Sequence, residues 1–176
     1  MSVSRPQATV RSRPIADFGW LHQVGRLTEV STVNIELLNT VPGGPELVEW
    51  FDGHAPRFHD AEVTSIAFDR AGPTCLLRVH GFKVTRTVKL DGPYVFEGHA
   101  VVTLRIDEVT GMQLDDFNHQ NALMGLSIVR GPKEGFRVEL DPAYGVSGFI
   151  EGRSLSIAIE PGIPQGSQYE AQNDVR

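Results

Sequence analysis

From residue 61 onward, hydrophobic and polar residues alternate with a period of two, which is typical of half-buried β-strands. The longest run has Phe96, Gly98, Ala100, Val102, Leu104 and Ile106 on one face. The alternation predicts strands at 62–69, 74–81, 84–90, 96–106, 123–130, 135–140, 146–151 and 153–160. Turn-forming residues separate several of these runs, at Arg70–Pro73, Asp91–Pro93, Gly131-Pro132 and Glu151-Gly152. Short strands with short links predict a mainly antiparallel sheet, folded as a β-sandwich or an open barrel.

A different pattern precedes the strands. Pro45 and Glu46 suit the first turn of a helix, and the apolar residues Leu47, Val48, Trp50 and Phe51 follow at helical spacing. Gly53 is a suitable stop. We therefore expect one short N-terminal helix at 45–52, which makes the fold class mainly β (α+β).

The two ends of the chain differ from this body. Residues 1–43 read as an extension of uncertain order, with helical spacing around residues 20–27 and strand-like alternation of Val33, Ile35 and Leu37. Residues 161–176 lose all apolar periodicity and read as a disordered tail. The sequence thus predicts a single β-rich domain at 44–160.

Composition narrows the possible partners and the compartment. The net charge of −6 disfavours nucleic acid, whose phosphates an acidic surface repels, and leaves a basic protein as a suitable partner. Cys75 is the only cysteine, so the chain can form neither an internal disulfide nor a cysteine-based zinc site, as fits a reducing cytoplasm. No apolar run approaches the roughly 20 residues of a membrane span. Oligomeric state stays open.

Two histidine-centred patches concentrate the polar chemistry. The first is Phe58-His59-Asp60-Ala61-Glu62-Val63, and the second is Phe117-Asn118-His119-Gln120-Asn121, which Asp116 precedes. Side chains of this kind either fix the backbone by hydrogen bonds or form a binding face. We assign a structural or binding patch to His59, Asp60, Glu62, Asp116, Asn118, His119, Gln120 and Asn121.

Metal binding and catalysis are the sharper alternatives. His59, Asp60, Glu62 and His119 are competent metal ligands, but on a strand Asp60 and Glu62 share one face and His59 the other. His119 with Asp115 or Asp116 could serve acid–base chemistry, although a loop that caps a helical turn at 118–123 explains these residues better. We therefore expect no metal, no cofactor and no catalytic residue.

The two patches also carry a resemblance to a known family. Phe58–Val63, the 101–106 strand with Asp107-Glu108-Val109, and Asp116–Asn121 resemble the immunity protein 50 family. These are small bacterial proteins encoded beside polymorphic toxins, and the likeness spans roughly residues 45–160. The resemblance implies a binding activity against a toxin and no catalytic residues.

Together these features predict a non-enzymatic cytoplasmic binding protein that neutralises a cognate bacterial toxin by direct contact. The alternative is a small metal-dependent hydrolase that uses His59, Asp60, Glu62 and His119.

Overall fold

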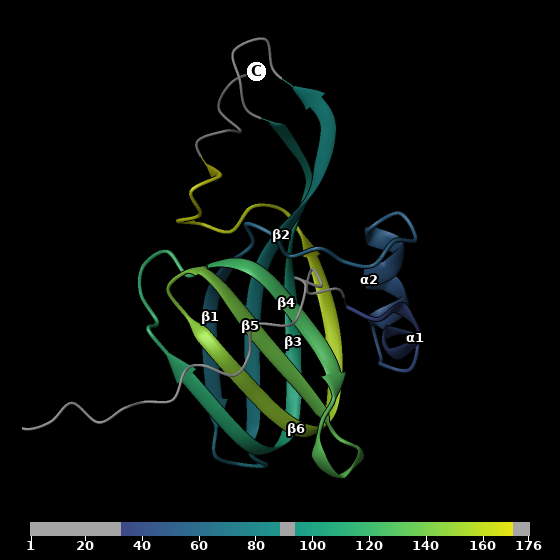
Figure 1. Cartoon of the computed structure of the whole chain (residues 1–176), viewed down its shortest axis with the longest axis vertical. Coiled ribbons are helices and arrows are strands. Elements are labelled where there is room, and N and C mark those ends of the chain that lie inside the picture. Colours follow the sequence, from purple (N-terminus) through teal and green to yellow (C-terminus); the bar gives the residue numbers. More distant parts are fainter. Residues whose placement is uncertain (1–32, 89–93, 171–176) are drawn as a thin grey trace, which may run out of the picture.

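Six antiparallel strands form the body of the protein (Figure 1). The computed structural model describes residues 33–88 and 94–170. The strands pair in the order β1-β2-β3-β6-β5-β4 and close into a barrel. Their bounds are β1 Glu62–Asp69, β2 Thr74–Val88, β3 Tyr94–Asp115, β4 Ala122–Arg130, β5 Phe136–Tyr144 and β6 Ser147–Pro161. The predicted mainly β, antiparallel fold is confirmed.

The barrel interior follows the alternation seen in the sequence. On β3, Ala100, Val102, Leu104 and Ile106 are each at most 1% exposed, as the period-two pattern predicted. Cys75 is buried, and burial raises the pKa of its thiol to about 11. The interior side chains of all six strands form one hydrophobic core.

The seam between β1 and β4 is short. One register pair, Glu62 with Ala122, joins these strands. Three main-chain hydrogen bonds flank it, from Asp60 N to Leu123 O, from Leu123 N to Ala61 O and from Val63 N to Asn121 O. The two histidine-centred patches therefore lie side by side along this seam, although almost 60 residues separate them in sequence.

Two short helices lie against one side of the barrel (Figure 1). Helix α2, Gly44–Trp50, confirms the predicted N-terminal helix. Helix α1, Ile35–Leu38, shows that the strand expected from Val33, Ile35 and Leu37 is wrong. The reason is local, because the side chain of Asn34 accepts hydrogen bonds from Glu36 N at 2.7 Å and Leu37 N at 3.3 Å. The helical spacing around residues 20–27 lies outside the described residues.

Several strands are longer than predicted. β3 runs to Asp115, past the predicted end at residue 106, and β5 runs to Tyr144, past the predicted end at residue 140. β2 is continuous from Thr74 to Val88, and with β3 it forms a ribbon that rises beyond the barrel (Figure 1). β6 is continuous across Glu151-Gly152, so the tight turn expected there is wrong. Gly152 is needed for close packing instead, because a Cβ atom at this position would lie 2.4 Å from Cγ2 of Ile106.

The residues after β6 depart most from expectation. Residues 162–170, which we expected within a disordered tail, run back over the barrel end at the base of the β2–β3 ribbon (Figure 1). Gly162 N donates to His99 O at 2.8 Å, and Tyr169 is only 6% exposed. We call residues 162–170 the C-terminal strap.

Candidate functional site

A hollow of about 250 Å³ opens at the β1–β4 seam. The first patch contributes Glu62 and Val63, the second contributes its whole length, and the C-terminal strap forms another wall. The lining residues are Glu62, Val63, Thr64, Phe117, Asn118, His119, Gln120, Asn121, Gln165, Gly166 and Ser167. The fold thus brings the two predicted patches to one place.

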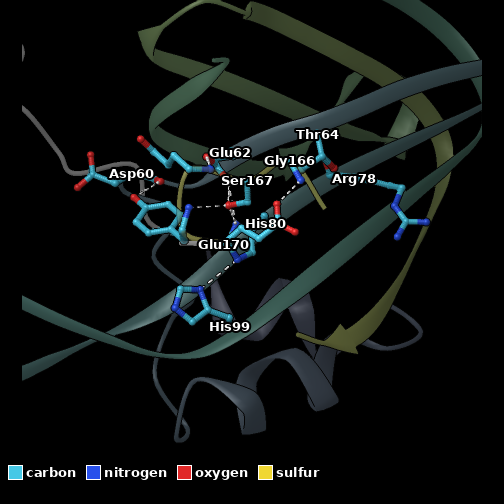
Figure 2. Close-up of polar contacts among 11 residues, drawn as sticks. Asp60, Glu62, Thr64, Arg78, His80, His99, Gly166, Ser167 and Glu170 are labelled. Atoms are coloured by element: carbon cyan, nitrogen blue, oxygen red, sulfur yellow. Dashed lines mark hydrogen bonds and ion pairs between the residues drawn. The ribbon is translucent and has the colours of Figure 1, made fainter. Parts of the chain in front are cut away.

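A chain of polar groups runs from Glu62, which lines this hollow, through His80 to His99 (Figure 2). The Nδ1 atom of His80 lies 2.9 Å from Oε2 of Glu62, and its Nε2 atom lies 3.1 Å from Nδ1 of His99. His80 is 0% exposed and Glu62 is 7% exposed. Because a carboxylate only accepts, Nδ1 of His80 carries the proton in this contact. In the neutral form of His80, Nε2 then accepts from His99.

The C-terminal strap completes the environment of Glu62. Ser167 Oγ donates to Oε2 of Glu62, and the main-chain N–H of Gln168 donates to Oε1 at 3.1 Å. The hydroxyl of Tyr169 donates to the main-chain oxygen of Asp60 at 3.3 Å. Each carboxylate oxygen of Glu62 therefore has a partner despite its burial.

The protonation equilibria reflect this arrangement. Burial alone would raise the pKa of Glu62, but hydrogen bonds from His80, Ser167 and Gln168 outweigh it and lower the pKa below 4.5. Burial and the neighbouring His80 lower the pKa of His99 below 6.5. Burial, with nearby Asp60 and Glu62, raises the pKa of the Tyr169 hydroxyl to about 12. The geometry thus favours an ionised Glu62, a neutral His99 and a neutral Tyr169.

In the second patch, two amides fix the loop between β3 and β4. Oδ1 of Asn121 accepts from Asn118 N at 2.8 Å and Val146 N at 3.2 Å, while its Nδ2 donates to Asn118 O. Asn118 Oδ1 accepts from Gln120 N at 2.9 Å. The expected helical turn at 118–123 is wrong, because these side chains hold an irregular loop and β4 begins at Ala122. Asp116 and Asn121 adopt positive φ angles of 58° and 44° in it.

The remaining predicted residues lie on the surface. His59 Nδ1 contacts Asp60 Oδ2 at 2.9 Å, and both side chains are about half exposed. His119 and Gln120 are exposed, so they present polar groups to solvent instead of capping the backbone. Within residues 33–88 and 94–170, no three His, Cys, Asp or Glu side chains are placed to hold a metal ion. The four residues named for a metal-dependent hydrolase therefore do not converge on one ion.

The buried chain does not form a nucleophilic triad either. In such a triad, histidine bridges the serine and the carboxylate through different ring nitrogens. Here Ser167 Oγ and Glu62 both lie on the Nδ1 side of His80, at 3.2 Å and 2.9 Å, and His99 occupies the Nε2 side. The arrangement can hold a charge and a proton in place, and it positions the strap.

Sequence reasoning missed four members of this site: His80, His99, Ser167 and Tyr169. His80 follows Leu77 and Val79 on β2 and points the opposite way, toward the outer face, which alternation predicts to be solvated. It is buried because the strap covers it. The sequence offers only one signal of this site. His80 and His99 are polar residues on the outward face of two predicted strands.

Comparison of the chain with protein-family models, with curated proteins and with solved structures found no match. The likeness to the immunity protein 50 family therefore stays a prediction. The fold and the site define a mainly β domain with a preformed hollow at its seam. No helix in the described part of the chain is both long and apolar enough to cross a membrane.

Proposed function

We propose that this chain is a non-enzymatic binding protein that neutralises a bacterial toxin by direct contact. The binding face is the hollow at the β1–β4 seam together with the loop of Asp116–Asn121 beside it. The observation that carries the proposal is the convergence of both polar patches on this hollow.

The loop is preorganised to bind. The buried Asn121 ties it to the main chain of Asn118 and Val146, so little conformational entropy is lost when a partner docks. From this fixed base, Phe117 projects with 56% of its surface exposed, beside the exposed His119 and Gln120. An exposed aromatic residue with polar neighbours is a common anchor of protein interfaces.

Charge supports a basic partner. The net charge of −6 would speed the encounter with a cationic toxin and would repel nucleic acid. A single buried thiol without a disulfide partner suits the reducing cytoplasm, where such a toxin would be met.

The test is co-expression with the protein encoded by the adjacent gene. We expect protection of the host cell and a complex that survives gel filtration. Phe117→Ala and Gln120→Ala should weaken the complex, each by about tenfold or more for a central contact. Val129→Ala is the matched control, because Val129 is 40% exposed near the other end of β4. No protection and no complex with the unmodified chain would refute the proposal.

A further inference from the structure

The C-terminal strap covers outward-facing residues of the barrel. Along β2, Cys75, Leu77 and Val79 point inward, so His80 points outward, yet His80 has no exposed surface and the nearby Phe82 only 4%. Both rings contact Tyr169, with centroid distances of 5.7 Å and 4.7 Å. The strap therefore contributes to this burial, together with Phe96 and His99 on the neighbouring strand β3.

Tyr169 sits within a ring of four aromatic side chains. Its ring centroid lies 5.5 Å from that of Phe96 and 5.8 Å from that of His99, in addition to the contacts with His80 and Phe82. Several of these pairs have the edge-to-face geometry that aromatic rings favour. The four rings therefore pack around one tyrosine side chain.

Beside the rings, Glu62 binds the two residues that precede the tyrosine. Its two carboxylate oxygens accept hydrogen bonds from the hydroxyl of Ser167 and the main-chain N–H of Gln168. This contact is anionic and part-buried, and it matches a hydroxyl followed by a free N–H. Glu62 and the aromatic ring together therefore fit a segment with a serine two residues before a tyrosine.

The strap holds its shape largely by itself. Ser167 Oγ accepts from Tyr169 N at 3.1 Å, and Glu170 Oε2 accepts from Gly166 N at 2.9 Å. None of residues 162–170 belongs to a strand of the barrel. A segment of this kind, with its own turn and a few side-chain anchors, resembles a docked peptide more than a sheet element.

We propose that Glu62, His80, Phe82, Phe96 and His99 form a peptide-recognition site for a Ser-x-Tyr segment, which the chain's own residues 166–170 occupy reversibly. This site goes beyond toxin neutralisation and does not depend on it. Because Gln165, Gly166 and Ser167 also line the hollow at the seam, release of the strap removes one wall of that hollow.

Acid weakens the occupied state, because protonated Glu62 is a poorer acceptor for Ser167 and Gln168. The titratable groups around this carboxylate are His80 on β2, with His99 behind it on β3, and Tyr169 of the strap, which also lies near Asp60. Oε2 of Glu170, on the strap, accepts a hydrogen bond from Gly166 N. Protonation of Glu62 is therefore the step that loosens the strap.

The test offers the site a labelled peptide with the sequence of residues 163–170. In the full chain carrying Tyr169→Ala, the strap loses its main anchor, and the peptide should bind. In the unmodified chain, the tethered strap competes at a high effective concentration, so binding should be at least about tenfold weaker. In the Tyr169→Ala chain, the additional substitution Glu62→Gln should weaken peptide binding about tenfold. Alanine in place of the tyrosine of the peptide should weaken binding by the same factor. Equal binding to both chains, or none to a Tyr169→Ala chain with native circular dichroism, overturns the proposal.

Hydrogen exchange of the unmodified chain decides the question if Tyr169→Ala does not fold. At neutral pH, the amide of Gln168 should exchange well before those of Val102 and Leu104 on β3, because the strap opens while the barrel stays intact. Exchange of Gln168 only together with the barrel overturns the proposal.

Discussion

Glu62 and Ala122 are register partners, and their pairing closes the barrel. The same residue that joins β1 to β4 also points its carboxylate at His80 and receives the C-terminal strap. Closure of the barrel, burial of the polar chain and formation of the hollow are therefore linked at one position.

Replacement of Glu62 by glutamine should destabilise the protein. Glutamine keeps the size of the side chain but removes the charge that attracts three hydrogen-bond donors. We expect the free energy of unfolding to fall by about 1–3 kcal/mol, measured by urea denaturation. Glu160→Gln is the control, because Glu160 pairs with Arg78 on the surface and should change stability by about 0.5 kcal/mol or less. Equal effects of the two substitutions would show that the buried contacts of Glu62 contribute nothing.

Stability should fall on acidification in two steps. The folded pKa of His99 lies below 6.5, so folding is favoured above that pH and becomes weaker as the pH falls through the lowered value. Glu62 adds a second loss below pH 4.5, because its folded pKa is also lowered. The urea midpoint should therefore decrease as the pH falls below 6.5, and again as it falls below 4.5.

His99→Gln separates these two steps. A glutamine does not titrate, so the decrease that begins below pH 6.5 should become smaller while the decrease below pH 4.5 remains. An unchanged upper step in this variant would contradict the assignment to His99.

Asn121→Ala should loosen the loop between β3 and β4. The substitution leaves the N–H groups of the part-buried Asn118 and the buried Val146 without their acceptor, at a cost of about 1–3 kcal/mol. Gln120→Ala, in the same loop but exposed, should leave the melting temperature almost unchanged. Calorimetry of both variants checks this, and similar melting temperatures would show that the amide network does not hold the loop.

Gly148→Ala should be far more harmful than Gly53→Ala. Both glycines have positive φ angles, 121° and 77°, but a Cβ at Gly148 would lie 2.0 Å from the main-chain oxygen of Gln113, whereas Gly53 has open space around it. We expect a loss of about 3 kcal/mol at Gly148 and about 1 kcal/mol at Gly53, from denaturation midpoints. Comparable losses would mean that β3 and β6 can separate without cost.

The elements that could be predicted from the sequence are those with a periodic hydrophobic pattern. Alternation along 100–106 identified the inward residues of β3, and the apolar stripe of 45–52 identified α2, since both patterns reflect local geometry. The inward face was wrongly extended to Gly98, which is exposed, and to Phe96, which packs against Tyr169 of the strap. Glu151-Gly152 was misread as a turn, because the sequence does not show that Ile106 packs against that glycine. The stretch with Val33, Ile35 and Leu37 was misread because its alternation is too short to outweigh the cap from Asn34.

Only part of the candidate site could be predicted, because the sequence shows local patterns and not contacts between distant segments. Both histidine-centred patches stood out by composition, and the fold brings Glu62 and the Phe117–Asn121 loop to one hollow. His80, His99, Ser167 and Tyr169 did not stand out, because their burial arises from contact between segments almost 90 residues apart. Period-two hydrophobicity, which is a local property of each strand, determined that this chain folds into antiparallel β-structure around one core. Only the tertiary structure decided that the strap covers the outer face of β2 and β3, because burial of a polar residue depends on what packs over it.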